Sequence, residues 1–286
     1  MKMAVIGCGL IGGSMALSWK RAGIVDEVIA FGHNPATLQK ALDKGAADTV
    51  TTSMEEAVKD ADIVVSAVPV EAMESVFTEM APFLKSDAVV TDVGSTRQTV
   101  IAAARKGLGD KFHQYAPAHP IAGGEMPGVD YASADLFDEK VVISTPDEGM
   151  DPKVVTFIEE AWRKAGARVQ AMSPLQHDLT FASVSHLPHV LAYALVDMIA
   201  REENAQEKLK MAGAGFRDFT RIASSSPVMW RDICLSNREA LSHELKRYRA
   251  SLDTLQKYID ESDGKALESV FENAVKNRRG LVFPGK

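Results

Sequence analysis

Cysteine is scarce in this sequence. Cys8 and Cys234 are the only two among 286 residues, so they cannot form a disulfide framework. Their spacing fits no metal-ligand pattern, and no other set of histidine, cysteine or acidic residues has the spacing of a metal site. We therefore expect a reduced, cytoplasmic protein without a metal.

Clusters of basic residues are also missing. The chain has 39 acidic and 32 basic residues, a net charge of −7, and no long run of lysine and arginine. This balance argues against a nucleic-acid partner. With 46% hydrophobic residues the chain can bury a sizeable core, which excludes intrinsic disorder. Its length suits one large domain or two ordinary ones.

Uninterrupted apolar runs are lacking as well. Segment 3–19 has no charged residue, but glycines interrupt it, it is shorter than a membrane span, and no clear cleavage site follows. We therefore expect neither a signal peptide nor an anchor there. No later stretch is expected to cross a bilayer, so we expect no membrane partner.

The first part of the chain alternates short apolar runs with helical patterns. The runs that predict strands lie at 2–6, 28–31, 63–68, 88–91, 141–144 and 168–170. The patterns that predict helices lie at 10–21, 71–83, 96–106 and 152–165, with a further helix after Pro35. This order predicts a parallel sheet covered by helices on both faces, an α/β domain of the Rossmann type over residues 1–172.

From Ser173 onward the strand signals stop. Amphipathic stretches at 176–200, 205–213 and 229–260 predict an all-helical second domain over residues 173–286. Pro188 is expected to kink the first of these helices.

A glycine-rich turn joins the first predicted strand to the first predicted helix. Gly7 permits a tight turn, Gly9 lets the backbone approach a pyrophosphate, and Gly12 allows the helix to pack closely on the strand. The first helical residues, Leu10 and Ile11, then direct backbone N–H groups at the anion. Because the glycines stand between a strand and a helix, they indicate a dinucleotide cofactor.

The second predicted strand ends without an acid. The carboxylate that holds the adenosine ribose of NAD is expected about 20 residues after the glycines, where this sequence has Gly32. No acid occurs between Glu27 and Asp43. A 2′-phosphate is then not repelled, and His33 and Asn34 are able to donate hydrogen bonds to it. Both could instead be ordinary turn residues, but the pattern favours NADP over NAD.

Two segments of the α/β domain carry polar groups suited to catalysis. Ser95 follows a strand end, where parallel strands face the ligand crevice, although it could equally cap the next helix. His119 is followed by a proline and then a glycine pair, and histidine titrates in the working pH range of an acid–base catalyst. A buried histidine bonded to the backbone is the alternative for His119.

The helical domain has two further polar patterns. Ser185 and His189 are four residues apart and share a helix face, as do Arg217 and Arg221. A fork of arginines suits a carboxylate substrate, and surface ion pairs are the common alternative.

These motifs follow one another along the chain. They are the glycine turn, Asp92-Val-Gly-Ser95, His119-Pro-Ile-Ala-Gly123, Ser185-His-Leu-Pro-His189, Phe216-Arg-Asp-Phe-Thr-Arg221 and Pro227-Val-Met-Trp230. Together they resemble the prephenate/arogenate dehydrogenases of tyrosine biosynthesis over nearly the whole chain. The resemblance implies a Rossmann-type dinucleotide-binding domain followed by an all-helical dimerisation domain, and hence a homodimer.

The resemblance also implies roles for the residues. His119 accepts the proton of a cyclohexadienyl hydroxyl, and Ser95 holds the hydroxyl and the imidazole in line. Hydride passes from that ring carbon to the nicotinamide, and carbon dioxide leaves as the ring becomes aromatic. Arg221 binds a substrate carboxylate.

Further residues are expected to line the two binding sites. Those expected to bind substrate are Ser185, His189, Trp230, Glu125, Glu139 and, reaching into a partner's site, Asp178. Those expected to bind the cofactor are Gly7, Gly9, Leu10, Ile11, Gly12, Gly32, His33, Asn34, Val68 and Pro69.

The choice between arogenate and prephenate depends on the substrate side chain. An acid beside the site favours the ammonium of arogenate over the keto group of prephenate. Glu125 lies near the catalytic histidine. Asp138 and Glu139 precede a predicted strand, where the resemblance implies that acidic residues go with arogenate use. The sequence therefore favours arogenate, although all three acids could simply face solvent. Gly124, often threonine in the family, removes one side-chain contact.

Other functions fit parts of the pattern. A prephenate-specific dehydrogenase is the nearest alternative. A 3-hydroxyacid dehydrogenase has the same domain order but usually relies on a lysine of the helical domain, and segment 176–200 contains none. A nicotinamide-sensing regulator needs the glycine turn but not His119, Ser95 and Arg221 together.

Overall fold

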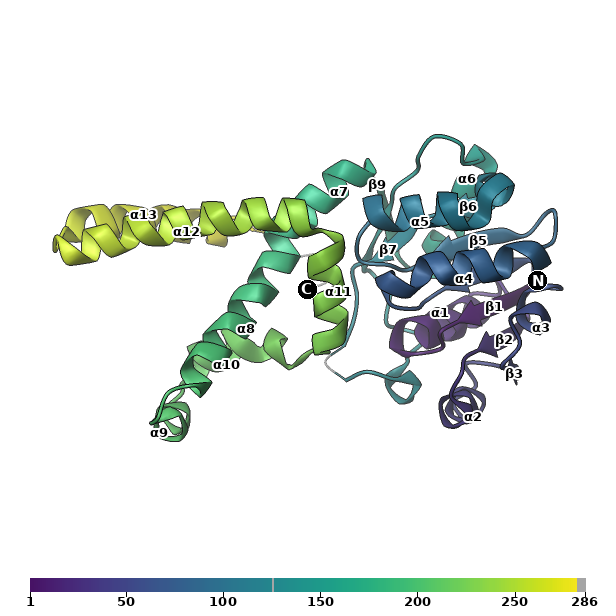
Figure 1. Cartoon of the computed structure of the whole chain (residues 1–286), viewed down its shortest axis with the longest axis horizontal. Coiled ribbons are helices and arrows are strands. Elements are labelled where there is room, and N and C mark those ends of the chain that lie inside the picture. Colours follow the sequence, from purple (N-terminus) through teal and green to yellow (C-terminus); the bar gives the residue numbers. More distant parts are fainter. Residues whose placement is uncertain (125, 282–286) are drawn as a thin grey trace.

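The chain folds into an α/β part and a helical part that extends away from it (Figure 1). This is a computed structural model, and it describes residues 1–124 and 126–281. The α/β part ends at a strand that closes at Ala171, and the first helix of the second part begins at Pro174.

A six-stranded parallel sheet forms the centre of the α/β part. Its strands are β1 (Lys2–Ile6), β2 (Glu27–Phe31), β3 (Thr49–Thr51), β4 (Ile63–Ser66), β5 (Val89–Asp92) and β6 (Tyr115–Ala116). Their order is β3-β2-β1-β4-β5-β6. The strands are added on one side of β1 up to β3 and on its other side from β4 onward, so the strand order reverses between β1 and β4. The expected Rossmann-type domain is confirmed, and ligands of such sheets bind at that reversal.

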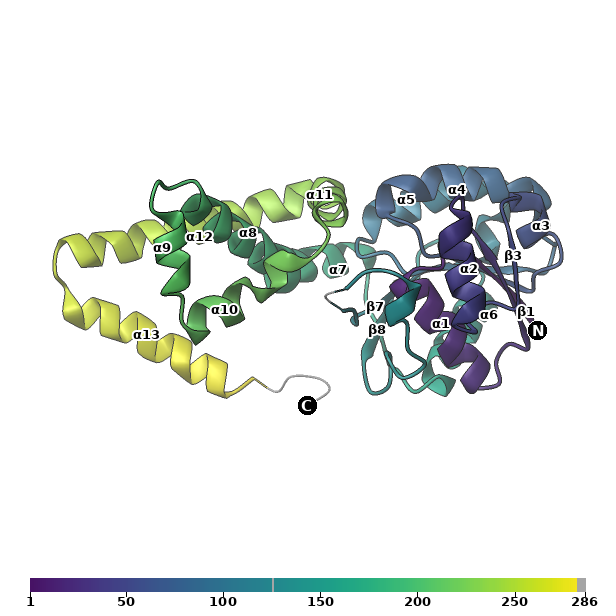
Figure 2. The same ribbon diagram turned by 90° about the horizontal axis from the view of Figure 1, so that it is seen from below.

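Helices cover both faces of this sheet. They are α1 (Leu10–Arg21), α2 (Pro35–Asp43), α3 (Met54–Val58), α4 (Met73–Met80), α5 (Gln98–Leu108) and α6 (Pro152–Lys164). On one face, α1, α2 and α6 bury a core in which the rings of Trp19 and Trp162 meet edge to face at 5.6 Å. On the other face, α3, α4 and α5 bury Phe77 against Tyr115. Figure 2 shows these two layers on opposite sides of the strands.

A small second sheet follows the main one. It consists of β7 (Ala118–Pro120), β8 (Val141–Ser144) and β9 (Arg168–Ala171), with β7 antiparallel to β8. His119 therefore lies on β7, opposite Ile143. The short strands β3, β6 and β7 were not expected from the sequence, because segments of two or three residues carry no periodic signal.

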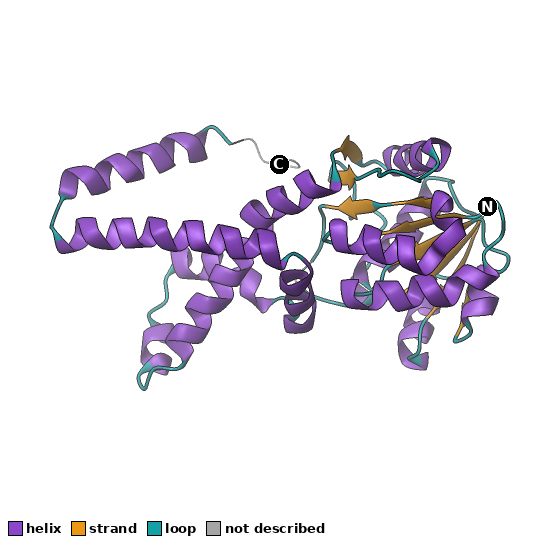
Figure 3. Cartoon of the chain, turned by 45° about the horizontal axis from the view of Figure 1, so that its top comes forward, coloured by secondary structure: helices purple, strands orange, loops and turns teal. Residues whose placement is uncertain are grey.

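In the second part, every regular element that the structure describes is a helix or a helical turn. The helices are α7 (Pro174–Phe181), α8 (Leu187–Ala200), α9 (Ala205–Lys210), α10 (Ala214–Thr220), α11 (Pro227–Ser236), α12 (Arg238–Asp260) and α13 (Gly264–Arg279). The expected all-helical domain is confirmed. The predicted single helix over 229–260 breaks at Asn237, and α13 was not predicted. Helix α12 projects away from the sheet and α13 turns back (Figure 3).

The junction of α7 and α8 differs from the kink expected at Pro188. A π-helical turn, Ala182–His186, joins the two helices, and Pro188 lies in the first turn of α8. A proline is tolerated there because the first N–H groups of a helix have no partner within it.

The combined helix Pro174–Ala200 corrects the expectation that no stretch after residue 19 is long and apolar enough to cross a bilayer. Its 27 residues are long and apolar enough to cross a membrane by length and composition alone, with a mean hydropathy of 1.4 in the best window. Core helices of soluble proteins pass the same test, and this finding is weak support for a span.

A buried group of charges links the two parts. The Arg97 guanidinium donates to both carboxylate oxygens of Asp92 at 2.6 and 3.1 Å, and both side chains are fully buried. The Tyr115 hydroxyl donates to the same carboxylate at 2.6 Å. From the helical part, the Asp178 carboxylate accepts the backbone N–H groups of Arg97 and Gln98 at 2.7 and 2.9 Å. Asp178 therefore caps the start of α5.

We expect Asp92→Asn to destabilise the protein strongly, because it leaves the buried Arg97 charge uncompensated. The expected loss in the free energy of unfolding is about 3–5 kcal/mol. Glu74→Gln, which removes an exposed partner of Lys106, is the control and should cost about 1 kcal/mol or less. Urea unfolding measures both, and equal losses would contradict the importance of the buried pair.

Candidate active site

The glycine turn leaves no room for side chains at two of its positions. Gly7 has a φ of +93°, and a Cβ there would lie 2.8 Å from the Ala67 carbonyl oxygen. A Cβ on Gly12 would lie 2.5 Å from the Gly7 carbonyl oxygen. A Cβ on Gly9, in contrast, would meet nothing within 4 Å. The turn is therefore closed on the protein side and open at Gly9.

The open side of the turn suits an anion. Helix α1 has Gly9 at its N-cap and no side chain capping it, so the N–H groups of its first turn, at Leu10 and Ile11, are available. No acidic residue occurs in that turn. Val68, beyond the end of β4, packs 3.1 Å from the Cβ position of Gly7, and the exposed Pro69 follows it. The predicted cofactor residues of β1, α1 and β4 are thus brought to one sheet edge.

The end of β2 lies at the same edge. The Gly32 N–H donates to the Thr51 carbonyl, and His33 is exposed beside Phe31. The Asn34 carbonyl Oδ1 caps α2, accepting from the N–H groups of Ala36 and Thr37. The alternative role of Asn34 as a turn residue is therefore realised, but its amide Nδ2 has no bond within the described chain and remains a donor.

We expect Gly9→Ala to separate folding from nucleotide binding. The added methyl group meets no protein atom within 4 Å, so the midpoint of urea unfolding should be unchanged. The methyl group stands where a pyrophosphate approaches the backbone, so the Kd for NADP or NAD should rise about tenfold or more. Fluorescence titration measures the Kd, and unchanged affinity would show that phosphates do not bind at this turn.

A row of hydrogen-bonded side chains leads to His119. Nδ1 of His119 lies 2.8 Å from Nε2 of His177, and Nδ1 of His177 lies 2.9 Å from Oδ1 of Asp178. Because a carboxylate only accepts, Nδ1 of His177 carries the hydrogen and its Nε2 accepts. His119 therefore donates from Nδ1 and keeps a lone pair on Nε2. We call these three residues the histidine relay.

The surroundings of the relay keep both imidazoles neutral. Burial lowers the pKa of His119 well below its ordinary value, and the neighbouring His177 and Arg97 lower it further. Burial also lowers the pKa of His177, against the opposing effect of the Asp178 carboxylate. Burial opposes the charge on Asp178, but bonds from His177 and two backbone amides hold the pKa of this carboxyl below its ordinary value. A neutral His119 can act as a base.

A second group of polar side chains lies in the helical part. The His189 ring stacks on Trp230 with centroids 3.6 Å apart, and its Nδ1 lies 2.9 Å from the Ser185 carbonyl oxygen. Trp230 is buried, and its Nε1–H has no partner among the described residues. Arg221 begins the short helical turn Arg221–Ser224, close enough for its charge to lower the pKa of His189.

His186 joins the two groups. Its ring lies edge-on to Trp230 at 6.1 Å, and its Nδ1 is 3.2 Å from the Asn237 amide, which also donates to the Asp178 carbonyl. Burial lowers the pKa of His186 to about 4, so this imidazole is neutral as well. Ser95 lies on the α/β side, half-buried in the loop between β5 and α5. Asp178, and not Ser95, caps the start of α5. The capping alternative for Ser95 is therefore wrong.

Several predicted site residues lie elsewhere or have other partners. The side chain of Glu139 is 78% exposed, and its neighbour Asp138 pairs with Arg21 at the end of α1. Helix α1 has 12 residues, so this end lies about 18 Å from the glycine turn. Glu139 is therefore not placed beside a substrate. Glu125 lies outside the described residues.

Two expectations for the helical part also need correction. Asp178 is 1% exposed and its carboxylate is bonded within its own chain, so it does not reach into a partner's site. Arg217 is exposed and pairs with its neighbour Asp218 at 3.6 Å. The surface ion pair, which was the alternative for these arginines, is therefore realised at Arg217.

The sequence did not single out several residues that the site depends on. They are His177, His186, Asp92, Arg97, Tyr115 and Asn237. A signal existed for two of them: His177 directly precedes Asp178 at the start of the helical part, and Asp92 opens the motif that contains Ser95. Their partners are distant in the sequence, so spacing alone does not reveal the contacts. The described residues include no group of three or more histidine, cysteine or acidic side chains that could hold a metal.

These features define a class of protein. A glycine turn at the reversal of a parallel sheet, with a histidine base beside a helical second domain, is the arrangement of a nucleotide-dependent oxidoreductase. Residues 15–171 match the family of the prephenate dehydrogenase nucleotide-binding domain, and residues 173–273 match that of the prephenate dehydrogenase dimerization domain. The chain therefore belongs to the prephenate dehydrogenase family, whose members act in tyrosine biosynthesis, and the resemblance seen in the motifs is confirmed.

Individual relatives agree with this membership. The cyclohexadienyl dehydrogenase of Zymomonas mobilis is 36% identical, covering 98% of this chain and 95% of that protein. The crystal structure of Aquifex aeolicus prephenate dehydrogenase with hydroxyphenyl propionate and NAD+ is 35% identical, with a TM-score of 0.90 and 98% of each chain covered. Synechocystis arogenate dehydrogenase is 27% identical, with a TM-score of 0.81 and coverages of 99% and 100%. The family match decides against a 3-hydroxyacid dehydrogenase.

Proposed function

We propose that this protein oxidises a cyclohexadienyl substrate with loss of carbon dioxide, and that it prefers arogenate to prephenate. The observation that carries the proposal is the histidine relay, which leaves Nε2 of His119 as a hydrogen-bond acceptor. A ring hydroxyl is the group whose proton such a base removes. A sensor without turnover would not need this arrangement.

Different residues of the chain bind different groups of the substrate in this proposal. Nε2 of His119 takes the hydroxyl proton, and Ser95 orients the hydroxyl from the loop after β5. Arg221 holds a carboxylate at the other end, with Ser185, His189 and Trp230 around the side chain. Departure of carbon dioxide makes the ring aromatic and is strongly downhill, so the protein needs mainly to position and deprotonate the substrate.

A nicotinamide dinucleotide supplies the hydride acceptor when it is bound. Gly7, Gly9 and Gly12 would hold its pyrophosphate at the start of α1, because the turn is open only at Gly9. The relative from Aquifex aeolicus was solved with NAD+. For this chain we propose NADP, since Gly32 replaces the ribose-binding acid and both His33 and the Asn34 amide offer donors.

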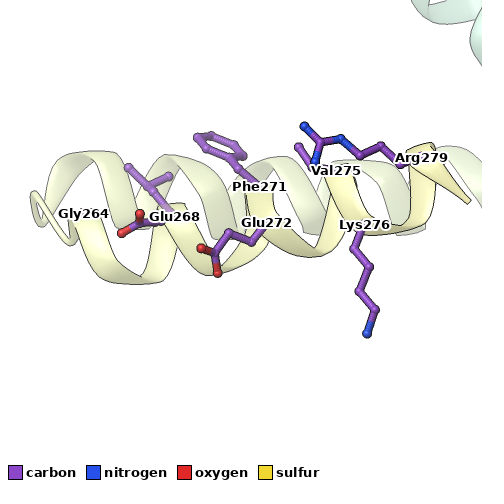
Figure 4. Close-up of a pocket in the computed structure, with 8 residues that line it drawn as sticks. Gly264, Glu268, Phe271, Glu272, Val275, Lys276 and Arg279 are labelled. Carbon is purple, nitrogen blue, oxygen red and sulfur yellow. The ribbon is translucent and has the colours of Figure 1, made fainter.

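The functional unit that we propose is a cytoplasmic homodimer formed through the helical part. Helix α13 carries the apolar side chains Leu267, Phe271 and Val275 four residues apart, and they line one groove with charged neighbours. Figure 4 shows Phe271 and Val275 on the side of the helix away from Lys276. Phe271 and Val275 are about half exposed, as they would be on a surface that a second copy covers.

The proposed function is tested by turnover of arogenate and prephenate, each with NADP and NAD, followed by nicotinamide absorbance. We expect turnover, with the highest kcat/KM for arogenate with NADP. His119→Asn is the matched variant; it should bind cofactor normally and lose about 10²–10⁴-fold in kcat, because the base is gone.

Three results would count against parts of this proposal. No turnover in any of the four mixtures, with cofactor binding intact, would contradict the proposed function. Near-normal turnover in His119→Asn would remove His119 from the mechanism. A clear preference for NAD would contradict the assignment of NADP.

A further inference from the structure

Arg97 is a buried cation that has no contact with substrate in the proposed reaction. It lies directly before α5, two residues after Ser95, and its side chain is 0% exposed. Its guanidinium holds both carboxylate oxygens of Asp92. A buried ion pair is weak evidence for a purely stabilising role, because removing two charges from water costs about as much as their attraction returns. The other bonds of Arg97 show what else the residue does.

Two of those bonds end on backbone groups beside the side chains proposed to contact the ring hydroxyl. Nε of Arg97 donates to the Thr96 carbonyl oxygen at 2.8 Å, and Thr96 directly follows Ser95. Nη1 donates to the Ala118 carbonyl oxygen at 3.4 Å, and Ala118 directly precedes His119 on β7. One planar guanidinium thus bonds the backbone next to both side chains.

The loop that carries Ser95 is also fixed from its other end. The Asp92 carboxylate accepts the Gly94 N–H at 2.7 Å in addition to both arms of the Arg97 guanidinium. A Cβ on Gly94 would lie 2.8 Å from Nη2 of Arg97 and 2.9 Å from Oδ2 of Asp92. Ser95 is the half-buried residue between the buried Gly94 and Thr96. The loop is therefore packed directly against the ion pair.

The backbone of Arg97 reaches the histidine relay as well. Its N–H donates to Oδ1 of Asp178 at 2.7 Å, and the same oxygen is bonded by Nδ1 of His177. Nε2 of His177 accepts the hydrogen of His119. The side chain of Arg97 thus bonds the backbone beside Ser95 and His119, and its N–H bonds the acid at the end of the relay.

We propose that Arg97 is a positioning residue, which sets the place of Ser95 relative to His119 through the backbone of each. This inference rests on the proposed function, in which both side chains contact one ring hydroxyl. A displacement of about 1 Å between reacting groups costs up to about 100-fold in rate. Lysine is not equivalent at this position. Its ammonium can stay paired with Asp92, but it has no planar fork that bonds two carbonyl oxygens as well.

Arg97→Lys is the informative variant, because it keeps a positive charge beside Asp92. We expect kcat to fall about 10- to 100-fold and the Kd of the nucleotide to stay unchanged, since the glycine turn is not altered. The kcat is expressed per nucleotide-binding site, counted by fluorescence titration, so unfolded protein does not lower it. Arg105→Lys is the matched control and should keep kcat. Arg105 lies on α5 and likewise bonds a carboxylate and a carbonyl, those of Asp147 and Glu148.

A double-variant cycle separates positioning from a general weakening of the fold. Ser95→Ala removes the hydroxyl that Arg97 is proposed to place, so Arg97→Lys should lower kcat by a smaller factor in that background than in the unchanged protein. A purely structural role predicts the same factor in both. Gly94→Ala keeps both charges but presses a methyl group against the ion pair, and it should also lower kcat per site. It replaces Arg97→Lys if that variant does not fold.

The outcomes separate this inference from the function on which it rests. Turnover by the unchanged protein, with the same kcat per site in Arg97→Lys or with equal factors in the two backgrounds, would overturn the inference alone. If only Gly94→Ala folds, an unchanged kcat per site in that variant would do the same. No turnover of arogenate or prephenate by the unchanged protein would overturn the proposed function and the inference with it.

Discussion

The carboxylate of Asp178 is the contact on which the arrangement of the site depends. It is buried, and its oxygens accept two backbone N–H groups at the start of α5 as well as the imidazole of His177. One side chain of the helical part thereby caps a helix of the α/β part and fixes the tautomer of a histidine. The position of the helical part and the protonation of the base at His119 are set by the same group.

The row of neutral histidines follows from this contact. His119, His177 and His186 all lie in surroundings where burial favours the neutral ring. A cation nearby, Arg97, is neutralised by Asp92 and does not require a further acid. A base that stays neutral needs no proton removed before it meets the substrate hydroxyl. The two ends of the proposed substrate site thus differ: the relay end is a neutral, half-buried base, and the Arg221 end is a cation beside His189.

The parts of this structure that sequence could predict are those governed by local pattern. The strands at 2–6 and 141–144 and the helix at 10–21 have the expected bounds, because apolar periodicity and a glycine turn are local signals. His119 and His189 could be singled out from their motifs. The partner of His119 could not, because His177 lies 58 residues away in the sequence. Glu139 was expected beside substrate, but the pairing of Asp138 with Arg21 draws its loop to the far end of α1.

The most direct test of the account is the pH dependence of kcat/KM for the preferred substrate, since this quantity reports the base in the free enzyme. The account predicts that kcat/KM stays level as the pH falls through 6.5, the ordinary pKa of histidine, and declines only well below it, because burial and His177 keep His119 neutral. A decline centred at or above 6.5 would contradict the account. It would mean that His119 is solvated like a free imidazole, or that another group is the base.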